Sequence, residues 1–304
     1  MEMSALISKM VIFVALMVVG YVFARSGRAG KDFAKAASWL VLNLFLSATI
    51  LNSVMATDAV LSGAELGHVL LVLTIAVVMC YVLAIVAAKI IPSKGKAAEY
   101  TMLMAVPNNM FIALPVIESI CGPIGVFYCS LTCIPFNILL YTYGVWKMKD
   151  GQEGGLRLKD IISIPLVATI LALVIFVLKL PIPGVLKDLF SAASGATMPL
   201  SMIVIGASLG SVNIFAAFKD WRFYAADVVR LIVTPLLVLL VCGLITTNWE
   251  LLMTAFIMSA APSGIVITVF ALQYDKDEVF SSEGILHSTV VSMLTIPLMV
   301  YFFA

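Results

Sequence analysis

Charged side chains are scarce in this sequence. Asp, Glu, Lys and Arg together make up 12% of its 304 residues, whereas 62% of the residues are hydrophobic. A soluble domain is about a quarter charged and nearer half apolar. The composition therefore excludes an ordinary soluble domain and predicts a polytopic membrane protein embedded in a lipid bilayer. The formal net charge is only +1, which indicates no nucleic acid partner.

Several chemical signatures are also missing. The apolar runs are long and continuous and lack the period-2 alternation of a membrane barrel, so the fold class is predicted to be all-α. The sequence has no Walker-type loop, no Gly-rich dinucleotide turn and no metal-ligand cluster, which argues against a nucleotide-driven pump. We expect no cofactor and no metal. The five cysteines are an odd number without a pairing pattern, so we interpret them as packing residues.

The apolar runs predict ten transmembrane helices, each long enough to cross a bilayer. Short polar connections separate most of them, and the longest connection, residues 147–159, is charged and Gly-rich. The predicted spans cover about residues 5–24, 33–54, 67–91, 97–120, 124–146, 160–179, 189–211, 222–246, 250–272 and 280–303.

The distribution of Lys and Arg predicts an orientation. Most of these residues lie in the connections that follow the odd-numbered spans, such as Arg25 and Arg28 after the first and Lys94 and Lys96 after the third. Because positive residues favour the cytoplasmic side, we expect both termini to be extracytoplasmic. The first apolar run lacks a basic segment before it and is read as a retained span rather than a signal peptide.

The fourth span contains an interruption. Pro107 and Pro115 each remove a backbone donor inside an apolar run, and Asn108 and Asn109 lie beside the first proline. A simple kinked helix is one reading, since proline is tolerated in membrane spans. The other is a broken helix whose free backbone groups and amides face a polar cavity.

An internal repeat favours the broken helix. Residues 31–38 resemble residues 187–194 at five of eight positions, and Pro107 lies over Pro262 at nearly the same offset. We therefore divide the chain into a first five-helix repeat, a cytoplasmic linker and a second five-helix repeat, at residues 1–146, 147–159 and 160–304. Five spans per repeat require the second to be inverted. The prediction is a 5+5 inverted repeat in which broken helices four and nine cross near the membrane centre.

These stretches resemble the auxin efflux carrier family, whose bacterial members include malonate and malate permeases. The similar patterns are the two interruptions, Met198-Pro199-Leu200-Ser201 with Ile205–Leu209 in the seventh span, and Arg230-Leu231 with Pro235 in the eighth. The resemblance implies scaffold and transport subdomains, an elevator-like or rocking cycle, and a homodimer. Asn109 and Met110 replace the Thr-Gly of many bacterial members, and Ser263 replaces a glutamine of plant carriers, which argues against auxin as the substrate.

The expected substrate site lies at the two interruptions. Asn amides both donate and accept hydrogen bonds, a glycine lets a ligand approach the backbone, and a half-helix N-terminus suits a carboxylate. Helix-to-helix hydrogen bonding is the alternative for the asparagines. The predicted substrate-binding residues are Pro107, Asn108, Asn109, Ser263, Gly264, Ile265 and Asn43, and the predicted helix-break residues are Pro107, Pro115 and Pro262.

Three further residues are candidates for ion or proton coupling. Asp227 and Arg230 share a helix face at i, i+3, where they could form a structural ion pair. His287, in the tenth span, could titrate near neutral pH or be a satisfied buried histidine.

The sequence thus predicts a secondary transporter of a small organic anion, a mono- or dicarboxylate, in a bacterial inner membrane. Proton and sodium coupling both stay open. One alternative is a solute sensor that does not transport. A more remote alternative is an intramembrane serine hydrolase using Ser263 and His287, but the chain carries no further oxyanion-type motif, so we predict that it is not an enzyme.

Overall fold

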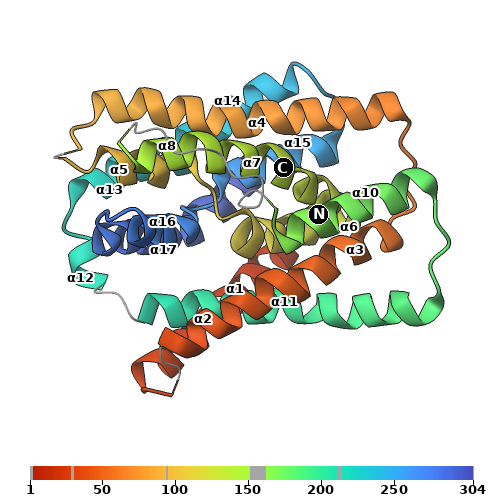
Figure 1. Cartoon of the computed structure of the whole chain (residues 1–304), viewed down its shortest axis with the longest axis horizontal. Helices are drawn as coiled ribbons and strands as arrows, with labels where there is room; N and C mark the ends of the chain where they lie inside the picture. The colour runs from red at the N-terminus through yellow and green to blue at the C-terminus, as the bar shows by residue number, and fades with distance from the viewer. Residues whose placement is uncertain (1–2, 29–30, 94, 151–161, 211–213, 304) are drawn as a thin grey trace. The chain divides into compact units, whose positions relative to one another are not determined.

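The computed structural model describes residues 3–28, 31–93, 95–150, 162–210 and 214–303 (Figure 1). Their regular structure is helical, and apart from one isolated β-bridge these ranges contain no strand. The predicted all-α class is therefore confirmed. Most of the predicted linker, residues 151–159, lies outside the described residues.

The helices fall into α-helices and four π-helical turns, labelled η. In chain order they are α1 (Met3–Arg25), α2 (Lys31–Leu40), η1 (Val41–Phe45), α3 (Leu46–Ala56), α4 (Gly63–Ile90), α5 (Ala97–Ala105), η2 (Asn109–Ala113), α6 (Leu114–Leu131), α7 (Cys133–Leu139), η3 (Leu140–Gly144), α8 (Val145–Met148), α10 (Ile164–Leu178), α11 (Gly184–Gly210), α12 (Ile214–Ala217), α13 (Trp221–Asp227), η4 (Val228–Val233), α14 (Thr234–Gly243), α15 (Trp249–Ala260), α16 (Val266–Gln273) and α17 (Glu278–Phe303).

Six helical segments of the described chain are long and apolar enough to cross a membrane. Three shorter apolar helices, at Val11–Arg25, Ile164–Leu178 and Trp249–Ala260, accompany them. Each of the ten predicted ranges contains helix in the structure, but the count of ten spans and their inverted 5+5 arrangement stay predictions. The six segments are Phe33–Ala56, Gly63–Ile90, Asn109–Met148, Gly184–Gly210, Trp221–Gly243 and Glu278–Phe303.

A sharp bend divides α6. Gly122 has φ +65° and ψ −158°, outside the helical region, and Pro123 follows it. Glycine tolerates a positive φ because it has no Cβ, and proline cannot continue the hydrogen-bonding of the preceding turn. The bend falls between residues 120 and 124, where the sequence predicts the fourth span to end and the fifth to begin.

The chain folds into two compact units, each built from three separated stretches. Unit 1 comprises Met1–Leu73, Met110–Cys133 and Ile162–Ser211, and unit 2 comprises Thr74–Asn109, Ile134–Ile161 and Val212–Ala304. Each unit therefore draws on both predicted repeats.

Close packing of small residues organises unit 1. Helix α1 lies along α11 (Figure 1), and the two backbones approach where Gly20 and Gly206 have no side chain. A Cβ on Gly206 would lie 1.9 Å from the Met17 carbonyl oxygen, and one on Gly20 would lie 2.0 Å from the Ile203 carbonyl oxygen. Small residues allow membrane helices to gain van der Waals contact over a long interface. Gly206 belongs to the Ile-Gly-Ala-Ser-Leu stretch that resembles a family signature.

In unit 2, α17 packs against α5, α13 and α16. Gly284 of α17 gives the close approach here, because a Cβ at this position would lie 2.5 Å from the Leu103 side chain of α5. The same two helices carry Leu103 and Ser288, which hydrogen-bond to the candidate site described below.

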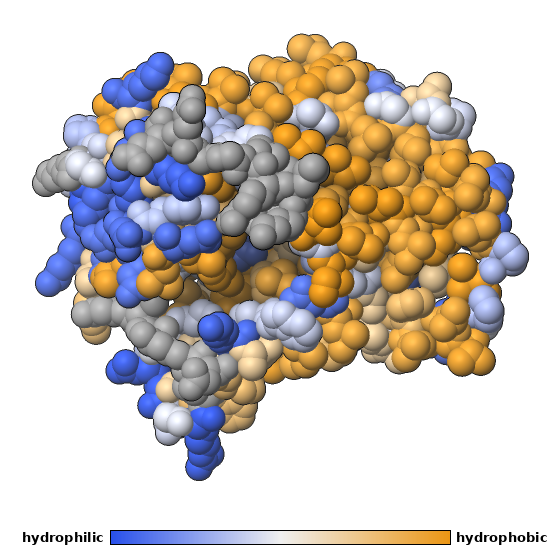
Figure 2. All heavy atoms as spheres, viewed as in Figure 1, coloured by the Kyte–Doolittle hydropathy of each residue, from blue (hydrophilic) through white to orange (hydrophobic). Residues whose placement is uncertain are grey.

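Many of the side chains exposed on the face shown in Figure 2 are apolar. Exposed residues of α4 illustrate why: Leu71, Val78, Val82 and Val86 recur at the spacing of one helix face. An apolar surface of this kind is costly in water and suits contact with lipid.

Candidate functional site

Two interrupted helices meet in unit 2. Helix α5 ends at Ala105, where Val106 is extended (φ −99°, ψ 106°) and Pro107 follows. Helix α15 ends at Ala260, where Ala261 is extended (φ −64°, ψ 147°) and Pro262 follows. The residue before a proline is pushed out of the helical region, so the sequence itself stops both helices at these points.

A single antiparallel bridge joins the two interruptions, pairing Pro107 with Ser263. The Asn108 N–H donates to the Pro262 carbonyl at 2.7 Å, and the Gly264 N–H donates to the Val106 carbonyl at 2.9 Å. Backbone groups released from a helix inside a membrane need partners, because lipid offers none. Each interruption supplies the partners of the other.

Ser263 is held on both sides. Its N–H donates to the Ser288 hydroxyl of α17 at 3.0 Å, and its own hydroxyl donates to the Leu103 carbonyl of α5 at 2.7 Å. Sequence reasoning did not assign Ser288 this role. Because its partner lies on another helix, nothing in the local sequence indicates the contact.

The two asparagines are both buried, with exposed fractions of 5% for Asn108 and 4% for Asn109. Neither Oδ1 nor Nδ2 of Asn109 has a hydrogen-bond partner among the described residues. A buried primary amide normally forms hydrogen bonds, because leaving it unpaired costs free energy. Asn109 therefore presents an unused donor and an unused acceptor next to the bridge.

Beyond the second interruption, Ile265 precedes the first residue of α16, and no side chain caps this end of the helix. The N–H groups of Ile267 and Thr268 donate to the Gly264 and Ile265 carbonyls at 3.2 Å and 3.1 Å. Gly264 lies close to the first interruption, since a Cβ on it would be 3.1 Å from the Pro107 carbonyl oxygen. The interruption thus combines a close backbone approach with an uncapped helix start.

The predicted coupling residues form a buried polar group in the same unit. Asp227 Oδ2 lies 2.9 Å from His287 Nδ1, and the imidazole is fully buried. Rings of Phe218 and Tyr224 lie within 4.7 Å and 4.4 Å of the imidazole centroid. The structure therefore pairs Asp227 with His287, from a helix distant in sequence, and not with its near neighbour Arg230.

Two predicted residues lie in unit 1 instead. Asn43, in the π-helical turn η1, is half-buried and its amide donates to the Trp39 carbonyl of its own helix at 2.8 Å. Pro115 lies near the start of α6, which continues directly from η2 with helical angles at Ala113, so the helix does not break at this predicted helix-break residue.

A charged network lies at one end of unit 2. Lys96 Nζ is 2.5 Å from Asp277 Oδ2, and the Asp277 N–H donates to Glu99 at 3.1 Å. The hydrogen bond from Lys96, together with the N–H of Phe280, lowers the pKa of Asp277 below its usual range. Arg222, on α13, is bound by Asp220 and by the Ser93 carbonyl.

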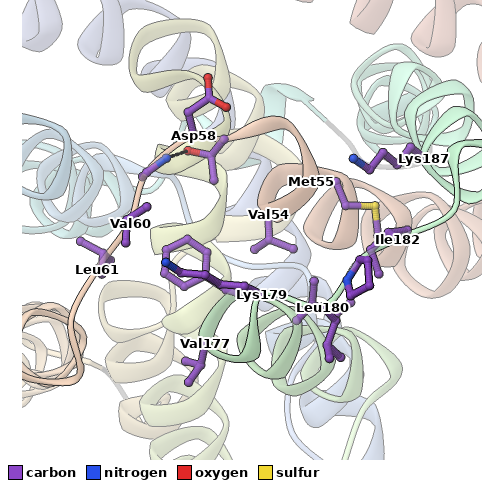
Figure 3. A pocket seen from close by; sticks show the side chains of 15 residues that line it. Val54, Met55, Asp58, Val60, Leu61, Val177, Lys179, Leu180, Ile182 and Lys187 are labelled. Atoms are coloured by element: carbon purple, nitrogen blue, oxygen red, sulfur yellow. Dashed lines mark hydrogen bonds between the residues drawn. The ribbon is translucent and has the colours of Figure 1, made fainter.

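Unit 1 has a separate pocket of about 310 Å³ (Figure 3). Val54, Val177 and Leu180 contribute apolar side chains to it, and Lys179 and Lys187 contribute exposed ammonium groups. It holds none of the residues that the sequence predicts for substrate binding.

The residues of the hydrolase alternative are engaged elsewhere. The Ser263 hydroxyl donates to the Leu103 carbonyl. The Nδ1 atom of His287 pairs with Asp227 Oδ2. A serine nucleophile needs its hydroxyl on the base. Within the described part of the chain, no group of His, Cys, Asp or Glu could hold a metal ion.

Comparison with known proteins gives two results. The family model described as "Membrane transport protein" matches residues 5–157 and 154–300. An "Uncharacterized transporter" from Methanothermobacter thermautotrophicus is 24% identical over an alignment of 300 positions that covers 93% of this chain and 93% of that protein. Both matches extend over nearly the whole sequence and include both interrupted helices. The chain belongs to the membrane transport protein family, the family of the auxin efflux carriers.

Proposed function

We propose that the protein is a secondary transporter of a small organic anion, a mono- or dicarboxylate, and that the substrate binds where the two interrupted helices meet. Membership of a transporter family supports transport in general. The choice of site and of substrate class rests on the chemistry of the interruption.

One observation carries the proposal. The buried amide of Asn109 has no partner in the described chain and lies next to a bridge between two broken helices. An unused donor and acceptor at this depth suit a solute with hydrogen-bonding groups. The start of α16, which follows Ile265 and has no side-chain cap, adds a partial positive charge that favours a carboxylate.

The hydrogen bonds around the bridge also favour a cycle in which both interruptions move together as a rigid body. Ser263 is bonded to α5 through Leu103 and to α17 through Ser288, so the two interruptions share their supports. We assign unit 2 the role of the transport subdomain and unit 1 that of the scaffold, in an elevator-like or rocking cycle with crossing helices four and nine.

Further parts of the proposal rest on the sequence. The distribution of Lys and Arg places both termini outside a plasma membrane. The family resemblance suggests a homodimer. The Asp227–His287 pair is a candidate proton carrier, while backbone carbonyls at the interruptions are candidates for sodium.

Uptake into proteoliposomes tests the proposal. Purified protein should accumulate at least one labelled mono- or dicarboxylate under a proton, sodium or voltage gradient, and Asn109→Ala should reduce this uptake. If no organic acid moves under any gradient, the transporter proposal fails. Saturable binding without flux would instead favour the solute-sensor alternative.

A further inference from the structure

Arg230 is the largest side chain that the structure buries completely. Its Nε, Nη1 and Nη2 atoms have no hydrogen-bond partner among the described residues. A guanidinium has five N–H donors and stays protonated in proteins, so it cannot relieve burial by losing its charge. Arg230 therefore holds a permanent positive charge in the interior of unit 2 with every donor open.

Arg222, eight residues earlier in the same helical segment, has hydrogen-bond partners for its guanidinium group. Its Nε lies 2.8 Å and 2.9 Å from the two carboxylate oxygens of Asp220, and its Nη1 donates to the Ser93 carbonyl at 3.0 Å. Arg230 has no such carboxylate or carbonyl. The open guanidinium is thus a local feature, not a general property of arginines in this unit.

Asp227 does not fill this role. It lies one turn before Arg230 and within electrostatic range of it, but its Oδ2 lies 2.9 Å from His287 Nδ1 and pairs with that ring. No ion pair joins Asp227 to Arg230 in the described chain. The carboxylate lowers the local potential, yet it gives the guanidinium no hydrogen bond.

Two buried hydroxyl groups of unit 2 also lack a hydrogen-bond partner among the described residues. Tyr81, on α4, is within electrostatic range of the guanidinium, and its buried hydroxyl has no partner in the described chain. Thr234 follows Arg230 by four residues, at the start of α14, and its fully buried hydroxyl also lacks a partner. Both hydroxyls can donate. A planar cation with two neighbouring hydroxyl donors forms an incomplete shell for an anion.

We propose that Arg230, Tyr81 and Thr234 bind a carboxylate group inside unit 2. The planar fork of the guanidinium matches the two oxygens of a carboxylate, and such bidentate pairs are stronger than neutral hydrogen bonds. The ligand is a small free acid or the carboxylate end of a longer one. The site differs in every residue from the interruption and does not depend on transport.

Thermal unfolding of the purified full-length protein at constant ionic strength tests this site, with formate, succinate and chloride as separate probes. A ligand that binds the folded state raises the unfolding midpoint as its concentration rises. In an Asn109→Ala background, which disables the proposed substrate site at the interruption, formate or succinate should raise the midpoint, and adding Arg230→Met should abolish that rise. A response to formate identifies a small free acid, and a response to succinate alone identifies a longer one.

Matched variants separate the site from general salt effects. Arg222→Lys, at the satisfied arginine, should keep the carboxylate response in the same Asn109→Ala background. Tyr81→Phe preserves the ring and removes one hydroxyl, so it should weaken the apparent affinity about three- to tenfold. This variant keeps the test decisive if Arg230→Met does not fold.

Three results would overturn the proposal. They are no response to either carboxylate, an equal response to chloride, and a carboxylate response that survives Arg230→Met or Tyr81→Phe unchanged. A loss of uptake in Asn109→Ala with an intact carboxylate response would concern the proposed transport site alone.

Discussion

The two units bury different kinds of polar side chain. In the described residues, the buried polar oxygens of unit 1 side chains are hydroxyls, such as those of Thr49 and Thr197, which lie 2.7 Å apart. Every buried amide and every buried charged side chain lies in unit 2, including Asn109, Arg230 and His287. A hydroxyl is readily satisfied by a nearby carbonyl, whereas a buried charge or amide is retained at a cost in stability. The difference indicates that unit 1 is built for packing and unit 2 for polar chemistry.

The packing of unit 1 should be the most sensitive to a single methyl group. Gly206→Ala places a Cβ 1.9 Å from the Met17 carbonyl oxygen, so α1 and α11 must separate. We expect a loss of about 3 kcal/mol in the free energy of unfolding, measured by denaturant titration in detergent.

Gly195→Ala is the matched control on the same helix. A Cβ there meets nothing within 4 Å, and alanine favours helix over glycine by about 1 kcal/mol. This variant should be as stable as the wild type or more so. Equal losses for the two variants would show that the α1–α11 approach does not stabilise unit 1.

In unit 2 the largest effect should be on function. Asn109→Ala removes a buried amide that has no partner in the described chain, so we expect folding stability to be kept or to increase. Uptake into proteoliposomes should fall by about tenfold or more, equivalent to one lost hydrogen bond of ~1.4 kcal/mol. Asn52→Ala, at a half-buried asparagine of unit 1, should leave uptake within about twofold. Unchanged uptake in Asn109→Ala would contradict substrate binding by Asn109, on which the proposed function rests.

Removing the hydrogen bond that supports the bridge should have a smaller effect, on stability. Ser288→Ala leaves the buried Ser263 N–H without its acceptor, and we expect a loss of about 1.5 kcal/mol in unfolding free energy. Ser292→Ala, one turn later, removes a hydroxyl that donates to the Thr289 carbonyl of its own helix, and should cost less. If the two variants are equally stable, Ser288 does not support the interruption.

The smallest effect should be on the pH dependence of stability. Because the hydrogen bond from Lys96 lowers the pKa of Asp277 in the folded state, the folded protein favours the carboxylate. The resulting stabilisation is present above about pH 4 and is lost as the pH falls through the lowered folded-state value. The pair is partly exposed, so we expect less than about 1 kcal/mol. Asp277→Asn should flatten the dependence of unfolding free energy on pH below about pH 4, and an unchanged slope in acid would contradict the assignment.

The positions of the helices could be predicted well from the sequence. Apolar runs and prolines give local signals, so the ends of α5 and α15 lie next to Pro107 and Pro262, as expected. Hydrogen-bond partners on different helices were harder to predict from the sequence. The spacing of Asp227 and Arg230 suggested an ion pair, but His287, 60 positions after Asp227, takes that place. Local spacing cannot rank a neighbour against a residue that only the fold brings near.

The π-helical turns were not predicted. Asn43, Asn109 and Arg230 each lie in such a turn, in η1, η2 and η4. A π-turn holds one extra residue, and it arises from packing around the helix rather than from any residue type. The turns therefore left no signal in the sequence, although they occur at three of the predicted site residues.

The bridge between the interruptions has a consequence for biosynthesis. The Ser263 hydroxyl and the Leu103 carbonyl are 160 positions apart, and both backbone hydrogen bonds of the bridge join the same distant segments. Chains emerge from the ribosome N-terminus first. The first interruption must therefore wait, its backbone groups unpaired, until the second has been synthesised and inserted. An N-terminal half expressed alone should be trapped in that immature condition and become a substrate for membrane quality control.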